Sequence, residues 1–387
     1  MEAETRYHPN AEQLALASTI EESLAPLLPL SRVHASHVED DQVWSSLDDI
    51  GIFGISVTEE QGGSGLGAAE EALIVMALGQ RLAAPAVLAT IGAAHALPGE
   101  AHTATGAATT SAGVAATAAG VAITPLASAA AAIRGRRVAA AYRRGARTII
   151  VEDAAAELLL VRGGADAALY ELSSCDSQPL DDRLWLAGLR EVVGSGQPAS
   201  VAQTTRSGPA GVAPQVGAAR EVGAAQGAAS SGLGAPIARF EAPQLLRLRL
   251  IDAAALAGIS QAALDMSVAY AGTRAQFGRP IGTFQAVKHH CANMVSAARR
   301  ARDQTCFAAV AVDEGRDDAA LQVECALFVA GSAALENAGK NIQIHGGMGF
   351  SDEADPHLLL KRAQLLIAIA GGLEAANERI ANIKAGW

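Results

Sequence analysis

Long helical segments joined by short connections fill the chain from Pro243 onward, and this feature limits the possible folds more than any other. Apolar residues at helical spacing predict helices over about residues 243–274, 284–315 and 317–344, and a fourth helix from Asp355. Pro243 suits a first helical turn, where its missing backbone N–H is not needed. Four long helices with short loops favour an antiparallel four-helix bundle.

The chain before this bundle divides into a helical region and a β-prone region. Residues 10–97 contain several short helical segments, separated by the turn-rich run Glu60–Gly65. Between residues 113 and 203, runs such as Thr148–Val151 and Leu158–Val161 alternate with Gly and Asp clusters, which predicts a small antiparallel sheet. Residues 194–234 are rich in Gly, Ala, Ser and Pro, which is typical of a loop or of a reduced part of the sheet domain.

The predicted fold is therefore mainly α-helical with a small β domain. We place an N-terminal helical domain at residues 1–112, a middle antiparallel β domain at 113–235 and a C-terminal four-helix bundle at 236–387. A chain of 387 residues is long enough for two or three domains. Aromatic residues make up only 4% of the chain, and its many alanines favour helix-on-helix packing.

The charge balance excludes one large class of partner. The formal net charge is −11, so no excess of Lys and Arg exists to neutralise phosphates, and we expect no nucleic-acid partner. An anionic small molecule stays compatible with this charge, because local arginines and helix ends can hold one.

The cysteines, the acidic N-terminus and the uncharged residues 101–133 bear on the cellular location. The four cysteines form no CxxC pair and have no His at zinc-finger spacing, which favours buried thiols over disulfides or a metal site. The first ten residues are polar and acidic, unlike a signal peptide. Residues 101–133 lack charged side chains but are built mainly from small residues, which gain little from lipid. We expect a cytoplasmic protein with no membrane segment and no metal.

Two Gly-rich segments at predicted helix junctions are the strongest candidates for a binding site. Residues 274–285 read RAQFGRPIGTFQ, and residues 341–350 read NIQIHGGMGF. Glycines permit close backbone approach to a ligand, exposed N–H groups bind oxyanions, and Arg274 supplies a forked, permanent positive charge. Taken singly, each segment is better explained as a helix-ending turn, with Gly278 or Gly346 as its cap.

Two other interpretations of the glycine clusters fail on spacing. The run Gly63–Gly67 lacks the G-x-G-x-x-G pattern of a dinucleotide loop and is predicted to be a turn. The string His345–Gly349 is similar to the oxyanion loop of lipase-like hydrolases, but the chain contains no G-x-S-x-G elbow.

Together, the two Gly-rich segments closely resemble the acyl-CoA dehydrogenase family. The resemblance covers roughly residues 40–90 and 243–385. The C-terminal matches are Tyr270, Arg274, Gln276–Gly278, Pro280–Gly282, Phe284–Ala286, Lys288, His289, Gln343, Gly346, Gly347, Gly349, Phe350, His357 and Leu360–Ala363. The N-terminal matches are Trp44, Leu47, Gly51, Gly54, Leu78, Gly79 and the string Glu59-Glu60-x-Gly62-Gly63-x-Gly65-Leu66.

The resemblance implies a flavoprotein that removes two hydrogens from Cα and Cβ of an acyl-CoA thioester. A glutamate takes the α proton, FAD accepts the hydride, and an electron-transfer flavoprotein or similar acceptor reoxidises the flavin. The implied assembly is a tetramer in which FAD crosses a subunit interface. The positions that hold its ADP end are intact here, namely Arg274, Gln276, Phe277, Phe284, Gln285, Gln343, Ile344, Gly346 and Gly347.

The chain departs from the family where the catalytic base and the flavin ring are expected. Ile369-Ala370-Gly371 replaces the family's Tyr-Glu-Gly, and the alternative position for the base, on the first bundle helix, falls near Leu248. Asp252 and Glu374 each lie one helical turn from these positions; both stay open as displaced bases, although a surface or capping role is favoured. After Ile123-Thr124-Pro125, no Gly-Ser-Asp segment and no Trp-Ser/Thr pair follows. No catalytic residue is therefore assigned.

This pattern is similar to that of the base-lacking subunit of heteromeric bacterial acyl-CoA dehydrogenases that act on sterol side-chain CoA thioesters. The resemblance implies a homologous catalytic partner in an α2β2 assembly, with a homo-oligomer as the alternative. Two other hypotheses stay open. In one, the chain is a stand-alone dehydrogenase that uses Asp252 or Glu374 as its base. In the other, it is a scaffold subunit without flavin.

Overall fold

The computed structural model describes residues 8–36, 38–96, 136–180, 188–193 and 232–383. The uncharged stretch 101–133, the Ile123-Thr124-Pro125 string and most of the Gly/Ala-rich segment 194–234 lie outside these residues. The predicted domain boundary at 112/113 lies outside them as well. The described part has the order that the sequence predicts, with helices first, then a sheet, then a helical bundle.

Short helices form the N-terminal region. Two of them begin at polar caps, since the Asn10 and Asp40 side chains accept hydrogen bonds from the backbone N–H groups of Gln13 and Val43. The helices are α1 (Ala11–Leu27), α2 (Arg32–Ala35), α3 (Asp41–Asp49), α4 (Ala68–Gln80) and α5 (Pro85–Ala94), with 3-10 turns η1 (Ile52–Gly54) and η2 (Glu59–Gln61) between α3 and α4.

A seven-stranded sheet follows, in the order β5-β6-β2-β1-β3-β4-β7. Its strands are β1 (Val138–Arg144), β2 (Arg147–Val151), β3 (Leu158–Arg162), β4 (Ala167–Glu171), β5 (Ser177–Leu180), β6 (Leu189–Val192) and β7 (Ala238–Arg239), with η3 (Leu172–Ser174) after β4. The described strands pair antiparallel except for β1 and β3, which run parallel, where the sequence predicted only antiparallel pairing. One face packs into the main core, and alternate residues form a smaller cluster on the other face.

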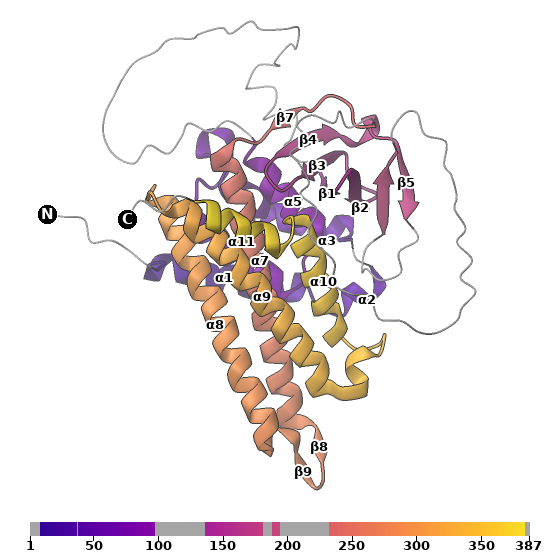
Figure 1. Ribbon diagram of the computed structural model, residues 1–387, viewed down its shortest axis with the longest axis vertical. Helices are drawn as coiled ribbons and strands as arrows, with labels where there is room; N and C mark the ends of the chain where they lie inside the picture. Colours follow the sequence, from indigo (N-terminus) through magenta and orange to yellow (C-terminus); the bar gives the residue numbers. More distant parts are fainter. Residues whose placement is uncertain (1–7, 37, 97–135, 181–187, 194–231, 384–387) are drawn as a thin grey trace, which may run out of the picture.

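The C-terminal region contains the four predicted bundle helices and one more. Helices α7 (Ala242–Thr273), α8 (Gln285–Asp313) and α9 (Ala319–His345) run side by side along the long axis, and α10 (Pro356–Ile369) and α11 (Leu373–Asn382) pack on α9 (Figure 1). The prediction did not separate α11. Gly371 and Gly372 both have φ of 92°, which ends α10 and redirects the chain.

A small hairpin marks the end of the bundle that lies far from the sheet (Figure 1). Strands β8 (Ala275–Gln276) and β9 (Arg279–Pro280), followed by η4 (Ile281–Thr283), connect α7 to α8 there. The 3-10 turn η5 (Gly346–Phe350) follows α9. The fold therefore brings both Gly-rich segments to the ends of bundle helices.

The N-terminal helix α4 crosses α7 at unusually short range. A Cβ atom on Gly258 would overlap the carbonyl oxygen of Met76, and a Cβ on Gly79 would overlap that of Ala255. The two glycines therefore set the distance between the helices, because any side chain there would push α4 away from the bundle.

A buried ionic cluster ties α4 to the bundle. Glu71 is 1% exposed, and its carboxylate lies 2.8 Å from His95 Nε2 and 3.1 Å from Arg247 Nη2, and accepts a hydrogen bond from Ser56 Oγ at 2.8 Å. Burial alone would raise the pKa of Glu71, but Arg247 and His95 outweigh burial and lower this pKa from 4.5 to about 2. Asp313 of α8 also accepts hydrogen bonds from the first N–H groups of α4, those of Ala68 and Ala69, at 2.6 and 2.9 Å.

One helical stretch in the described residues is long and apolar enough to cross a membrane. It is Ala319–Phe350, which comprises α9 and η5 and has a mean hydropathy of 1.3 in its most apolar window. Half of that window is buried inside the molecule, where α9 contacts α7, α8, α10 and α11. Its apolar character is therefore explained by its place among the bundle helices.

Candidate functional site

An open pocket of about 430 Å³ lies between the ends of α7 and α9, beside the hairpin. One wall comes from α7, the hairpin and η4, and the other comes from α9 and η5. The lining residues are Tyr270, Arg274, Gln276, Ile281, Ile344, His345, Gly347 and Met348. The two Gly-rich segments, far apart in the sequence, therefore form one pocket, which we call the bundle-end pocket.

A stacked pair of rings forms part of the bundle-end pocket. The rings of Tyr270 and His345 have centroids 4.0 Å apart and lie 25° from parallel. His345 Nδ1 donates a hydrogen bond to the Asn341 carbonyl at 2.8 Å, which places the ring proton on Nδ1. Burial lowers the pKa of His345 although the hydrogen bond to Asn341 opposes this, which favours the neutral imidazole.

The hairpin beside the pocket carries a solvent-exposed aromatic side chain, that of Phe277. Phe277 and Gly278 form its two-residue turn with φ of 54° and 77°, the combination that a tight primed turn requires. Phenylalanine rarely adopts a positive φ, and such strain costs about 1–3 kcal/mol. Phe277 is nevertheless 91% exposed. A strained and exposed aromatic residue at a hairpin tip indicates a role outside the isolated chain.

The bundle-end pocket suits the diphosphate and adenosine end of a dinucleotide. Arg274 is exposed at the end of α7 and can present its guanidinium fork to phosphate oxygens. Gly346 and Gly347 have open space, because a Cβ atom built on either would meet no described atom within 4 Å. Backbone groups there can approach a ligand closely. The residues present therefore fit the ADP end of FAD.

The structure sorts the nine predicted cofactor residues into two groups. Arg274, Gln276, Ile344 and Gly347 line the bundle-end pocket, and Phe277, Phe284, Gln285, Gln343 and Gly346 lie around it at the same end of the bundle. Arg279 stacks over the Phe284 ring at 4.2 Å from its centroid, which fixes that ring. That these nine residues bind FAD stays a prediction.

Sequence reasoning missed Tyr270 and His345 as pocket residues. Tyr270 lies four residues before Arg274, the C-cap of α7, and the Arg274 backbone N–H donates a hydrogen bond to the Tyr270 carbonyl at 2.8 Å. That spacing was the available signal for Tyr270. The contact with His345 comes from the packing of α7 on α9, which a single sequence does not specify.

The two places where a base was sought are closed and apolar. Leu248 is 2% exposed and Ala370 is 6% exposed. Between the sheet and the bundle, Leu248 and Ile369 line a cavity of only about 20 Å³, which we call the sheet–bundle cavity. A site for a small organic ligand usually needs about 300–1,000 Å³. In the described residues, this space therefore has no room for an acyl chain or a flavin ring.

Neither displaced base is poised for proton transfer. Asp252 lies at the sheet–bundle cavity, but Arg162 binds both its oxygens, with Nη1 2.7 Å from Oδ1 and Nη2 2.5 Å from Oδ2. Burial raises the pKa of Asp252, and Arg162 opposes this rise. Glu374 is exposed in the first turn of α11, where an acid interacts favourably with the helix dipole.

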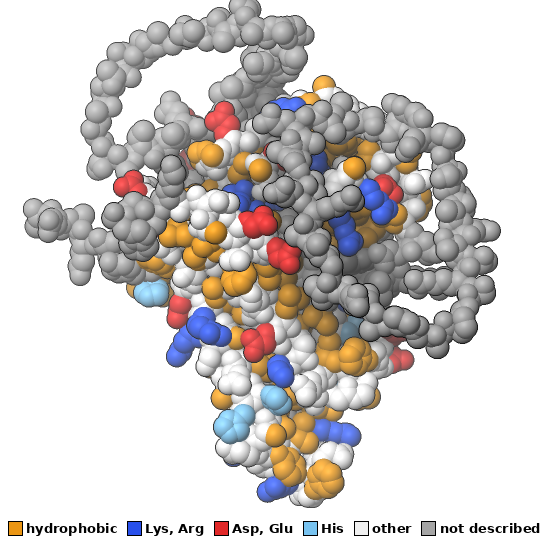
Figure 2. Space-filling model, viewed as in Figure 1, with side chains coloured by type: hydrophobic (Ala, Val, Ile, Leu, Met, Phe, Trp, Pro, Cys, Tyr) orange, Lys and Arg blue, Asp and Glu red, His pale blue; other side chains and the backbone are white. Residues whose placement is uncertain are grey.

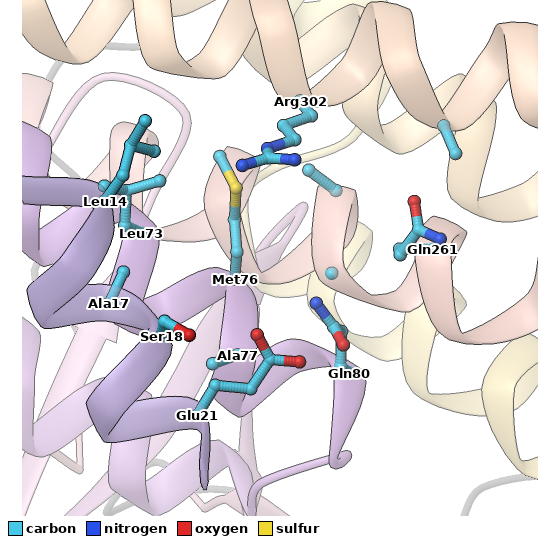
Figure 3. A pocket seen from close by; sticks show the side chains of 13 residues that line it. Leu14, Ala17, Ser18, Glu21, Leu73, Met76, Ala77, Gln80, Gln261 and Arg302 are labelled. Carbon is cyan, nitrogen blue, oxygen red and sulfur yellow. The ribbon is translucent and has the colours of Figure 1, made fainter. Parts of the chain in front are cut away.

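A further cavity, of about 330 Å³, opens between α1, α4, α7 and α8. Figure 3 shows that Arg302, Gln261, Gln80 and Glu21 line it together with apolar side chains such as Met76 and Leu14. None of the predicted cofactor residues lines it. Within the described residues, no group of three His, Cys, Asp or Glu side chains is placed to hold a metal ion.

The order of N-terminal helices, sheet and helical bundle, with the bundle-end pocket, defines an acyl-CoA dehydrogenase-type fold. Two family profiles match the chain: "Acyl-CoA dehydrogenase, N-terminal domain" over residues 10–107 and "Acyl-CoA dehydrogenase, C-terminal domain" over residues 241–383. The chain belongs to the acyl-CoA dehydrogenase family.

Named relatives each match about a third of the chain. Acyl-CoA dehydrogenase FadE34 of Mycobacterium tuberculosis is 44% identical over 124 residues, which is 31% of this chain and 17% of that protein. Acyl-CoA dehydrogenase IpdE2 of the same organism is 37% identical over 114 residues, 30% of this chain and 34% of its own length. The matches therefore span about a third or less of these relatives.

Solved structures share the whole fold at low identity. The ChsE4-ChsE5 complex from Mycobacterium tuberculosis matches with a TM-score of 0.64 and 18% identity over 99% of both chains. Butyryl-CoA dehydrogenase from Megasphaera elsdenii matches with a TM-score of 0.64 and 18% identity, over 97% of this chain and 98% of that one. These matches establish the fold.

Proposed function

We propose that this chain completes the FAD site of a heteromeric acyl-CoA dehydrogenase, whose base and flavin pocket belong to a homologous catalytic subunit. One contrast carries the proposal. The bundle-end pocket offers about 430 Å³ beside an exposed arginine, whereas the sheet–bundle cavity offers about 20 Å³ and no free carboxylate in the described residues.

The proposed task of this chain is to hold the ADP end of the cofactor. Arg274 binds the diphosphate, and the backbone of Gly346 and Gly347 approaches it closely. Gln276 in the pocket lining, and Gln285 and Gln343 around it, supply hydrogen bonds. Bound FAD would accept a hydride from the acyl-CoA, and electron-transfer flavoprotein or a similar acceptor would receive the electrons.

The surface around the bundle-end pocket supports the presence of a partner subunit. Phe277 is 91%, Phe350 74% and Met348 56% exposed, and all three lie at this end of the bundle. Figure 2 shows hydrophobic, basic and histidine side chains gathered there. Exposed apolar groups of this kind mark interaction surfaces. A partner that covers them would also bring the flavin half of the site.

Two solved relatives support the heteromeric arrangement and the substrate class. Two of the solved structures that share the fold are the ChsE4-ChsE5 complex and a Tcur3481-Tcur3483 steroid ACAD variant. By analogy, we propose an α2β2 assembly that dehydrogenates an acyl-CoA thioester with a sterol-derived side chain. The stand-alone alternative is disfavoured, since Arg162 binds both carboxylate oxygens of Asp252, and Glu374 is an exposed acid in the first turn of α11.

The substitution Ala370→Glu tests this division of labour. We expect no acyl-CoA oxidation by the purified single subunit, because a carboxylate must come within about 3 Å of the α-hydrogen beside a flavin ring. The space next to Ile369 cannot hold that ring. Steady-state turnover with an artificial electron acceptor measures the outcome, and Ala370→Gln is the matched control. Turnover by the lone Ala370→Glu subunit, absent in Ala370→Gln, would mean that its flavin site is complete.

A further inference from the structure

Five charged residues form a cluster at the junction of the sheet and the bundle. They are Arg162 of β3, Arg249 and Asp252 of α7, Glu324 of α9 and Arg379 of α11, and we call them the junction cluster. Both acids are 2% exposed. Arg162 binds both oxygens of Asp252, and Arg249 Nη1 and Arg379 Nε each lie 2.8 Å from Glu324 Oε1.

The junction cluster also holds the turn between β3 and β4. The Gly164 carbonyl accepts hydrogen bonds from Arg249 Nη2 at 3.3 Å and from Arg379 Nη1 at 3.2 Å. Gly371, in the turn between α10 and α11, packs against Gly164, since a Cβ built on it would lie 3.5 Å from the Gly164 Cα. The β3–β4 turn at one end of these strands is therefore bound to α7, to α11 and, through Glu324, to α9.

This clamp lies on the sheet–bundle cavity. Arg162 and Asp252 line that cavity together with Leu160 of β3, Leu248 of α7 and Ile369 of α10. A buried ion pair is held firmly, because separating it would leave an uncompensated charge out of water. The Arg162–Asp252 pair thus fills the polar part of the space between sheet and bundle, and apolar side chains fill the rest.

We propose that the junction cluster locks the sheet onto the bundle, and that Arg162 and Asp252 exclude an acyl chain from this subunit. This deepens the proposed function, because it assigns to two residues the absence of an acyl site here. The closure itself does not depend on FAD or on a partner. Asp252 is then a closing residue and not a displaced base.

The first test uses the full chain without substitution and octanoyl-CoA as the probe. At 1 mM octanoyl-CoA, we expect no change in hydrogen exchange over β3, α5 and α10, the elements around the sheet–bundle cavity. Protection of these elements in the unaltered chain would overturn the closure. It would leave the proposed FAD site untouched, because that site is judged from flavin retention.

The second test removes the charge but keeps the shape, with Asp252→Asn. We expect exchange over residues 158–171 and 370–373 to rise at least tenfold, while the α8–α9 pair is unchanged. The control is Asp265→Asn, which lies at an exposed position of the same helix and should change neither region. Unchanged exchange in Asp252→Asn, or an equal rise everywhere, would contradict a local lock.

The third test opens the space with the double substitution Arg162→Ala and Asp252→Ala, which removes both charges together. We expect octanoyl-CoA at 1 mM to slow exchange over β3, α5 and α10 at least threefold in this variant and not in the unaltered chain. No protection in a folded double variant would contradict the role of these two side chains as the barrier.

Discussion

Replacing Glu71 by Gln should lower the free energy of unfolding at pH 7 by about 3 kcal/mol. Glu71 is buried against Arg247 and His95, and these cations lower its pKa from 4.5 to about 2 although burial acts in the opposite direction. Each pKa unit corresponds to about 1.36 kcal/mol, so this shift corresponds to about 3 kcal/mol. Glutamine keeps the shape but removes the closer and more deeply buried of the two counter-charges of Arg247, since Asp313 Oδ1 lies 3.8 Å from Arg247 Nη1.

The same shift sets the pH dependence of this effect. A carboxylate with a lowered pKa stabilises the fold above its unfolded pKa, and this stability is lost as the pH falls from about 4.5 to about 2. Denaturant unfolding at several pH values should therefore show a large difference between the two proteins at pH 7 that shrinks below about pH 4.5. The control Glu60→Gln changes an exposed acid and should have little effect. A difference that stays constant down to pH 3 would contradict the ionic account.

Arg274→Ala should weaken FAD retention in the assembled complex by roughly 10- to 100-fold. A charge-assisted hydrogen bond contributes about 1.5–3 kcal/mol, and every 1.4 kcal/mol is a factor of ten in affinity. Arg274 supplies the exposed guanidinium in the bundle-end pocket. Fluorescence of released flavin, followed during dialysis of the complex, measures the loss.

Two companion variants separate a direct contact from a general charge effect. Lys288→Ala removes one positive charge at the same end of the bundle without touching the pocket lining, and it should change FAD retention little. Arg274→Lys keeps the charge but loses the two-pronged geometry of the guanidinium. Its FAD retention should therefore lie between those of Arg274→Ala and Lys288→Ala. Equal retention in Arg274→Ala and the unaltered complex would remove Arg274 from the site.

The helical bundle could be predicted because its signal is long and local. Each of α7, α8 and α9 carries many turns of helical periodicity, and the predicted ends lie within a few residues of those observed. The parallel pairing of β1 with β3 could not be predicted, because the antiparallel strand β2 lies between them in the sequence. Strand order depends on contacts that alternation along one strand does not encode.

In the candidate site, too, local motifs could be predicted and long-range contacts could not. The motif residues around Arg274 and Gly347 could be predicted from the sequence, since each segment has its own glycine pattern. The pairing of Arg162 with Asp252 joins a strand to a helix across ninety positions of the chain, and no local pattern indicates it. For this reason the sequence alone leaves Asp252 open as a base.

The most direct test of the FAD-completing role is the flavin absorbance of this chain purified alone and after co-expression with the homologous subunit that co-purifies from its native host. The account predicts no flavin bands for the chain alone, and bound FAD with acyl-CoA oxidation for the co-expressed complex. Bound FAD with acyl-CoA turnover by the chain alone would contradict it in favour of a stand-alone enzyme. If the partner subunit has the same FAD content and turnover with this chain as without it, the result would contradict the account in favour of a scaffold.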